Sequence, residues 1–549
     1  MRPRLAKVVG APPVRRLAGR VRGAPVTVAV VGGDARVARA LTPPWRARVV
    51  SVASAEEAVA AARGEDLALL AGDAVPAAGW LDALADAAYG ALGEGVGLVA
   101  GLVLGADGRI ESAGVQDAPG RGEGRRFAGA PASLPAAHAL QTVLGADPAC
   151  LYVTSGALAA LGGRLPFDPY DLWERGLRAA YTPHAVVRRT GPAPAPLAPG
   201  PVRRGASRGP DGARRIVYVT QDTGMGGGHR VVFDHLDGLR DRGHDTELWT
   251  LAPEGPDWYD LRSPVRWYRD YPSLMRALRD LDAVKVATWW ESAAWVWEAS
   301  VTRGTGVFFV QDIETTYYRE AGEPHEGERR RVLASYRPEF RFLATSHWVG
   351  EQLERLQPGG PPELAPPGIE DRWFAVPALE RRDDVGLGLG RSNPLKNFPL
   401  TRDAYLALPE PRPELWLFGG EPELGEGLGD RVTYHVRPSD AEVAGLLARA
   451  AVFVQTSSHE GYCLPIVEAM AAGVPVVCTD AHGNRDFCAD GVNCLMPDAT
   501  PEAVAAAIAR LLADPALRER LVAEGRRTAE AHRWGPRLDA LDAYFRALD

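Results

Sequence analysis

The sequence predicts an α/β protein in which residues 215–549 form two Rossmann-like lobes, with a smaller α/β domain before them. Short apolar runs rich in β-branched and aromatic residues alternate with segments of helical spacing, and these runs are nearly continuous. Strands of this kind are typical of parallel sheets that helices cover on both faces. A Pro/Gly/Arg-rich stretch without periodicity, residues 191–214, indicates a linker between the two parts.

The elements of the C-terminal part follow one another as β-α-β units. The expected strands are residues 215–220, 246–251, 306–312, 340–346, 385–391, 414–420, 451–457 and 474–480, and helices are expected at 440–450, 465–472 and 501–513. They divide into a first lobe at 215–378 and a second lobe at 379–535, and a last helix at 536–549 is expected to pack back on the first lobe. Because such sheets bind ligands at the carboxyl ends of their strands, the expected site is the cleft between the lobes.

Composition and charge narrow the range of functions. The chain has 46% hydrophobic residues, 24% charged residues and a net charge of −8, as in soluble globular proteins. This charge provides no general basic face, so nucleic acid is not expected as a partner. No apolar run reaches 18 residues, and we expect a cytoplasmic protein without a membrane span. Residues 1–25 carry seven basic residues and no acid, which indicates either a solvated tail or a peripheral contact with the inner membrane surface.

Cysteine spacing bears on the question of a metal site. The five cysteines are Cys150, Cys463, Cys478, Cys488 and Cys494. The last four are separated by 15, 10 and 6 positions, with no C-x-x-C pair, and each has apolar neighbours. This pattern favours small buried side chains in a reducing compartment over a zinc site, and no metal is expected in the functional site.

The segment HEGYCLPIVEAMAAGVPVV, residues 459–477, carries the strongest functional signal. Pro465 suits the first turn of a helix and Gly473 suits its end. Leu464 occupies the expected N-cap and has no side-chain acceptor, so the first amides of the helix are free to bind an anion. Glu460 and Glu468 flank this helix start, and both carboxylates can accept hydrogen bonds from sugar or ribose hydroxyls of one bound molecule.

The segment GLGLGRSNPLKNFPL, residues 386–400, carries the second signal. Arg391 ends an expected strand, and Lys396 follows after a short turn that contains proline. A guanidinium and an ammonium together are suited to clamp a diphosphate leaving group, although a solvated surface pair is the alternative. The chain has 62 basic residues but only three lysines, so its composition favours arginine over lysine. A lysine at position 396 departs from this preference.

These motifs, together and in this order, resemble those of retaining glycosyltransferase family 4, which has the GT-B fold. The resemblance covers residues 215–549 and rests on the G-R-x(n)-K-N/G and Glu-x7-Glu patterns. It implies a UDP-, GDP- or dTDP-linked sugar as donor, a glycan or lipid-linked acceptor in bacterial surface polysaccharide synthesis, retention of configuration, and no cofactor. The implied catalytic residues are Glu460, Arg391 and Lys396; the implied donor-binding residues are Glu468, Gly461, Tyr462, Cys463, Leu464, His435, Val436, Arg437, Gly226 and Gly227.

Two departures from the family pattern bear on the donor sugar. Cys463 replaces the second glycine of the usual E-G-F/Y-G-L-P sequence, and this adds bulk where the backbone approaches the donor. Many members also carry a histidine where this chain has Gln311 and Asp312, which are the acceptor-side candidates. The tryptophan-rich run 288–300 is a further candidate, either as a platform for sugar stacking or as core and inter-domain packing.

Residues 26–190 resemble a truncated glycosyltransferase family 2 domain, which is GT-A-like. An active member needs an acidic cluster at a strand end to hold a divalent metal on the donor. Here Ala71-Gly72-Asp73 offers one carboxylate, while Asp168 or Asp171 stands in the region of the catalytic base. The domain is therefore either a degenerate scaffold or a second active transferase. A bifunctional enzyme and a non-catalytic sugar-binding protein are the alternatives for the whole chain.

Overall fold

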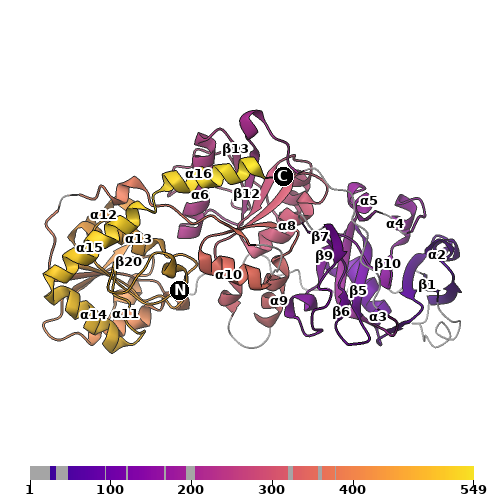
Figure 1. The fold of residues 1–549 in the computed structure, drawn as a ribbon, viewed down its shortest axis with the longest axis horizontal. Helices are drawn as coiled ribbons and strands as arrows, with labels where there is room; N and C mark the ends of the chain where they lie inside the picture. Colours follow the sequence, from indigo (N-terminus) through magenta and orange to yellow (C-terminus); the bar gives the residue numbers. More distant parts are fainter. Residues whose placement is uncertain are drawn as a thin grey trace.

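The computed structural model describes residues 25–32, 47–92, 94–118, 122–165, 168–192, 205–318, 325–356, 361–377 and 379–548. Three α/β units lie in an elongated row, with the N-terminal domain at one end and the C-terminal lobe at the other (Figure 1). Within these ranges no helix combines the length and the apolar character that crossing a bilayer requires. The expected membrane contact of the basic tail falls almost wholly on residues 1–24, which lie outside the described residues.

The N-terminal domain is built on a nine-stranded mixed sheet. Its main path runs β2 (Ala47–Val52), β1 (Val26–Val31), β3 (Asp66–Ala71), β10 (Cys150–Val153), β5 (Val96–Leu104), β11 (Arg178–Arg189), β4 (Ala74–Pro76), with β6 (Ile110–Ser112) on β5 and β9 (Gln141–Val143) on β11. The helices are α2 (Ala55–Ala62), α3 (Trp80–Asp86), α4 (Ser155–Ala160) and α5 (Pro169–Glu174), and a hairpin joins β7 (Val115–Ala118) to β8 (Gly122–Arg125). Every residue of β5 is buried, since this strand lies in the interior of the sheet.

The first lobe has a seven-stranded sheet in which all pairs are parallel. The strand order is β14 (Val265–Trp267), β13 (Asp245–Thr250), β12 (Arg215–Thr220), β15 (Val284–Ala287), β16 (Thr305–Val310), β17 (Arg341–Ala344), β18 (Glu363–Leu364). Its helices are α6 (Gly227–Asp241), α7 (Tyr271–Arg279), α8 (Trp290–Ser300), α9 (His325–Ser335) and α10 (His347–Leu356). The strand order reverses at β12, so the carboxyl end of β12 lies at the position where such sheets bind ligands.

The second lobe has a five-stranded parallel sheet. The order is β21 (Val432–Val436), β20 (Glu414–Gly419), β19 (Val385–Leu389), β22 (Val452–Gln455), β23 (Val476–Cys478). Its helices are α11 (Phe398–Leu406), α12 (Asp440–Arg449), α13 (Leu464–Ala471), α14 (Pro501–Ala513) and α15 (Pro515–Glu530). Here the order reverses at β19, which places the loops after β19 and β22 next to each other at the carboxyl edge.

The sequence-based assignment missed four strands of these two sheets: β14, β15, β18 and β21. The central strand β15 was hidden by Lys285, which interrupts the apolar run VKVA and is nevertheless fully buried. The Lys285 ammonium donates to the carbonyls of Ala299, at 2.6 Å, and Arg303, at 2.9 Å, near the end of α8. Burial lowers the pKa of Lys285 to about 7. A lysine that satisfies its donors on backbone carbonyls can therefore occupy a core strand.

The C-terminal helix α16 (Trp534–Ala547) returns to the first lobe and packs on α6, as Figure 1 shows. It begins two residues before the expected position 536. Its buried side chains Leu538, Leu541 and Phe545 join the core of the first lobe. Gly238 of α6 permits this approach, because a Cβ added there would lie 2.4 Å from Leu538 Cδ1. The helix thus ties the last segment of the chain to the first lobe.

The N-terminal domain docks on the first lobe through aromatic side chains. Trp297 of α8 is 5% exposed, and its ring meets Trp173 of α5 edge-on with centroids 5.4 Å apart. The Arg337 guanidinium lies over the Trp297 ring at 3.4 Å and donates to the Thr142 carbonyl at 2.8 Å. Trp290 is buried in the same cluster. Inter-domain packing is therefore the correct interpretation for Trp297, and core packing is the correct interpretation for Trp290.

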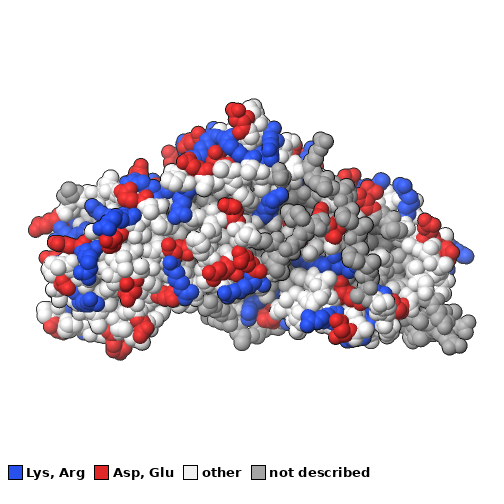
Figure 2. Space-filling model, in the orientation of Figure 1, with Lys and Arg blue, Asp and Glu red and all other residues white. Residues whose placement is uncertain are grey.

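Charged side chains are mixed over the surface. Figure 2 shows acidic and basic residues interspersed on the visible face, without a continuous patch of one sign. Many of them form local pairs, such as Arg262 with Asp241 at 2.7 Å and Arg382 with Glu414 at 2.8 Å. The visible face therefore offers no broad basic surface to a nucleic acid.

Candidate functional site

The loops after β19 and β22 form the centre of the site. Lys396 ends a short 3-10 turn, and its ammonium lies 2.6 Å from Glu460 Oε2. The Ser457 hydroxyl donates to Glu460 Oε1 at 2.7 Å, so both oxygens of this buried carboxylate are engaged. Burial of the Lys396 ammonium acts to lower its pKa, but the Glu460 carboxylate outweighs burial and holds the pKa above its usual value. Lys396 therefore stays positively charged.

Arg391 lies two residues beyond the end of β19 rather than within the strand, and its side chain is exposed. It forms no ion pair with any residue in the described ranges, but its guanidinium is near enough to Lys396 to repel the ammonium. The loop is held from behind, because Tyr434 donates to the Gly390 carbonyl at 2.6 Å and Glu421 accepts from the Ser392 amide at 2.6 Å. The two cations thus lie together on one loop.

The start of α13 lies next to these cations. Cys463, rather than Leu464, is the N-cap, and no side chain caps the helix. Cys463 has φ 85° and ψ 64°, in the left-handed region that glycine adopts without steric cost, so the cap cannot join the helix. The buried Cys463 thiol is close enough to Lys396 to interact with it electrostatically. The free amides of α13, Lys396 and Arg391 therefore converge at the carboxyl edge of the second lobe.

Glu468 belongs to a different group of charges. It lies in the second turn of α13, and its charged neighbours are Arg230, Asp440, Glu370 and Arg372. Burial raises the pKa of Glu468 to about 7; Arg230 works against this rise, whereas Asp440 and Glu370 add to it. The structure thus separates Glu460, bound to Lys396, from Glu468 in a second cluster.

Arg230 joins the two lobes in this second cluster. From α6 of the first lobe it donates to Glu370 Oε1 at 2.8 Å and to Asp440 Oδ1, at the start of α12, at 2.8 Å. Sequence reasoning missed Arg230, although it lies only two residues after the glycines of the motif at the start of α6. Arg230 thus ties the first lobe to the second.

The first lobe faces α13 with its glycine-rich loop. Gly226 is the N-cap of α6, and an added Cβ on Gly227 would lie 3.7 Å from Leu464 Cδ1. Gly461 lies directly against the Gln311 carbonyl, since a Cβ there would come within 1.9 Å of that oxygen. The N-termini of α6 and α13 are thus brought face to face, and Gln311 contacts the loop that carries Glu460.

Asp312 makes the second contact across the lobes. Its Oδ1 lies 2.6 Å from His459 Nε2, and its Oδ2 accepts a hydrogen bond from Tyr317 at 2.9 Å. His459 Nδ1 lies 3.3 Å from His482 Nδ1. Sequence reasoning missed His459, whose position directly before Glu460 in the motif was the available signal. Gln311 and Asp312 therefore both lie at the junction of the lobes.

The candidates for the base lie at the carboxyl end of β21. Val436 is 53% exposed, which is unusual for a large apolar side chain. His435 packs edge-on against Trp416, its Nε2 is buried with no partner in the described structure, and burial lowers its pKa. Arg437 has φ 46° and donates its amide to the Gly419 carbonyl at 2.6 Å. Tyr462 is buried and packs on Phe487 rather than on β21.

In the N-terminal domain an arginine occupies the oxygens of Asp73. Arg189 donates to Asp73 Oδ1 at 3.1 Å and to Oδ2 at 2.9 Å, and the Gly191 amide donates to Oδ2 at 3.0 Å. Arg189 also donates to Glu111 at 3.2 Å. Burial works to raise the pKa of Asp73, but Arg189 outweighs it and the pKa is lowered. A divalent cation at Asp73 would have to displace this guanidinium, so the residues present do not fit such a metal.

The C-terminal part of the chain is similar to known glycosyltransferases. Residues 370–528 match the family of glycosyl transferases group 1. The D-inositol 3-phosphate glycosyltransferase of Jonesia denitrificans is 27% identical over 320 residues, which are 52% of this chain and 71% of that protein. The lipopolysaccharide core biosynthesis glycosyltransferase LpsE of Rhizobium meliloti is 35% identical over 158 residues, 26% of this chain. The chain spans only 44% of the length of LpsE.

Solved structures establish the fold of the two lobes. Sucrose-phosphate synthase from Thermosynechococcus elongatus aligns with a TM-score of 0.52 at 20% identity, over 61% of this chain and 99% of that one. Anabaena Alr3699/HepE in complex with UDP and glucose aligns with a TM-score of 0.52 at 16% identity, over 61% of this chain and 100% of that one. The fold is α/β of the GT-B type, as predicted. Residues 370–528 match the family of glycosyl transferases group 1, and this match supports the prediction of a glycosyltransferase.

Proposed function

We propose that this chain transfers a sugar, with retention of configuration, from a nucleoside diphosphate sugar to a glycan or lipid-linked acceptor of the bacterial surface. The observation that carries the proposal is the convergence of Arg391, Lys396 and the uncapped start of α13 at one sheet edge. Two cations and free backbone amides together suit the two phosphates of such a donor. The relatives include proteins named for lipopolysaccharide core biosynthesis, which supports a surface glycan as product.

The reaction would proceed from the departure of the diphosphate. As the bond between the anomeric carbon and the phosphate oxygen breaks, negative charge grows on the diphosphate and positive charge on the sugar ring. Arg391, Lys396 and the α13 amides stabilise the diphosphate. The acceptor hydroxyl bonds to the anomeric carbon on the same face, and its proton passes to the leaving phosphate oxygen. The Glu460 carboxylate holds the Lys396 ammonium in position to stabilise the negative charge on the diphosphate.

The roles of the other predicted site residues are assigned from their positions relative to Lys396 and Glu460. We assign Glu468 to the ribose, and His435, Val436 and Arg437 to the base, because all lie at the carboxyl edge of the second lobe. Gln311 and Asp312 are assigned to the acceptor side, where they meet the Glu460 loop. The N-terminal domain, GT-A-like in this proposal, serves as a docked scaffold.

Nucleotide binding tests the proposal directly. A thermal-shift series of the full chain with UDP, GDP and dTDP should give a higher Tm with one of them, because a ligand that binds only the folded state stabilises it. At a concentration 100 times Kd the gain is about 2.7 kcal/mol. The matching nucleotide sugars should then release the same nucleotide when acceptor is added. Absence of a shift with all three nucleotides would favour a non-catalytic sugar-binding protein instead.

Nucleotide affinity is expected to depend on pH through Glu468. Its pKa of about 7 means that the carboxyl ionises between pH 6 and pH 8, and the ionised form is the stronger acceptor of hydrogen bonds from the two ribose hydroxyls. A ligand that prefers the ionised form binds more tightly as pH rises, by up to about tenfold over this range. The measurement is the Kd ratio of wild type to Glu468→Gln at each pH, in which the titration of the phosphate cancels. A ratio that stays constant with pH would remove Glu468 from the ribose site.

A further inference from the structure

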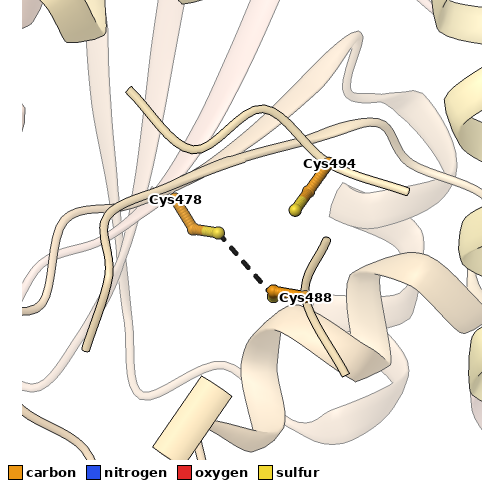
Figure 3. A group of neighbouring side chains, drawn as sticks. All are labelled: Cys478, Cys488 and Cys494. Carbon is orange, nitrogen blue, oxygen red and sulfur yellow. Dashed lines mark hydrogen bonds between the residues drawn. The ribbon is translucent and has the colours of Figure 1, made fainter. Parts of the chain in front are cut away.

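Three cysteines of the second lobe lie together, although they are spread over 17 residues of sequence. Cys478 ends β23, Cys488 follows the short 3-10 turn Gly483–Asp486, and Cys494 follows the next turn. Their three Sγ atoms lie within 4.8 Å of one another, and Cys478 Sγ lies 3.8 Å from Cys488 Sγ (Figure 3). The sequence favoured small buried side chains over a zinc site, and the meeting of the three sulfur atoms raises the question of a metal site again.

The spacing of the sulfur atoms suits a metal ion. Zinc binds thiolate sulfur at about 2.3 Å in a tetrahedron, so two sulfur ligands of one zinc ion lie about 3.8 Å apart. The Cys478–Cys488 distance equals this edge. A disulfide needs a sulfur separation of about 2.05 Å, so the observed distance fits a shared ion better than a bond. Figure 3 shows the three side chains close together, with those of Cys478 and Cys494 directed toward the space among them.

A neighbouring side chain donates a hydrogen bond to one of the sulfur atoms. The Asn484 side-chain amide donates to Cys478 Sγ at 3.8 Å. Donors to sulfur favour the thiolate form, and thiolates are the ligands that zinc and other soft ions prefer. Cys478 and Cys494 are buried, whereas Cys488 is half-buried and leaves a route of entry.

We propose that Cys478, Cys488 and Cys494 bind one thiophilic metal ion, with Zn²⁺ as the ion to be tested. Each thiol gives up its proton on binding, and the protons pass to the solvent. Within the described residues the group contains no fourth cysteine, histidine or carboxylate, so water fills the fourth position of a tetrahedral ion. None of the three cysteines is among the donor-binding residues named above.

The position of the site gives the ion a structural role. It would join the end of β23 to the segment that supports the Glu460 loop from behind. In that segment the Ala481 carbonyl accepts from the Glu460 amide at 2.9 Å, and the Gly483 amide donates to the Glu460 carbonyl at 3.1 Å. An ion bound at both ends of residues 478–488 would hold this support in place and raise the stability of the lobe.

Metal stoichiometry of the full chain tests the site without any measurement of transfer. The protein is reduced, stripped with a chelator, incubated with Zn²⁺, freed of unbound ion and analysed for zinc. We expect about one ion per chain in wild type and below about 0.2 in Cys488→Ser and in Cys494→Ser. Cys150→Ser is the matched control, because Cys150 is a buried cysteine of the N-terminal domain, and it should retain about one ion.

A second measurement uses wild type alone, so that it does not depend on the folding of any variant. Co²⁺ added in place of Zn²⁺ should give intense near-ultraviolet charge-transfer absorption from cobalt–thiolate bonds, and Zn²⁺ should abolish it. Zinc should also raise the Tm of wild type and leave that of Cys488→Ser unchanged. Wild type without bound zinc and without cobalt–thiolate absorption would overturn the proposal, as would equal zinc content in wild type and a Cys488→Ser/Cys494→Ser double variant. In either case the cysteines are packing residues.

Discussion

Replacing Lys396 with alanine is expected to lower the rate of sugar transfer by about 10²–10³-fold, since the loss of one preorganised group that stabilises developing charge costs about 2.7–4 kcal/mol. The ammonium is the only charge that contacts the Glu460 carboxylate directly in the described structure. Without this ammonium, only Arg391 and the α13 amides remain to stabilise the diphosphate. The measurement is the release of nucleoside diphosphate in the presence of donor and acceptor, at matched concentrations of folded protein.

Two controls make this prediction specific. Arg402→Ala removes an exposed cation from α11, four residues beyond the site loop, whose only described partner is its neighbour Asp403 at 2.7 Å. Asp73→Ala removes the carboxylate on which a second, metal-dependent site would depend. Both variants should transfer sugar at the wild-type rate, within about twofold. Normal turnover by Lys396→Ala would refute the assignment of the site, and loss of transfer in Asp73→Ala would instead favour the bifunctional enzyme.

The sequence could predict the centre of the site because its chemistry is local. Arg391 and Lys396 lie on one loop, and Glu460 and Cys463 lie on another, so each motif carries its own geometry. A parallel sheet then brings the two loops together, because the strand order reverses at β19. The N-cap was assigned one residue too late, since nothing in the sequence reveals that Cys463 adopts the left-handed conformation.

Contacts that depend on the closure of the lobes could not be predicted from sequence. Arg230 and Asp440 are 210 positions apart and meet only because the lobes close, and the same holds for Asp312 and His459. The meeting of the three cysteines could not be predicted for a related reason: their spacing has no local signature, and the turn at residues 483–486 brings Cys488 back to β23. Local sequence patterns therefore predict the helices and strands, whereas contacts between distant residues depend on the tertiary fold.

The docking of the N-terminal domain leads to the second large effect, a loss of stability in Trp297→Ala. Trp297 is 5% exposed and fills the space between Trp173 of the N-terminal domain and the Arg337 guanidinium of the first lobe. Truncation of a buried tryptophan to alanine costs about 3–5 kcal/mol through lost burial and the cavity left behind. The expected result is a Tm below that of wild type. Trp267→Ala, at a position 52% exposed, should change the Tm little.

Trp297→Ala should weaken the docking of the N-terminal domain without affecting nucleotide binding in the cleft. Arg337 would lose the ring beneath it but keep its bond to the Thr142 carbonyl at 2.8 Å and its pair with Glu339 at 2.9 Å, so the lobe itself should remain folded. We expect faster tryptic cleavage of the N-terminal domain, because a loosened interface lets this domain open more often. The Tm gain on nucleotide binding should persist, since no donor-binding residue touches Trp297. An unchanged Tm and cleavage rate would show that the aromatic contact contributes little to holding the two domains together.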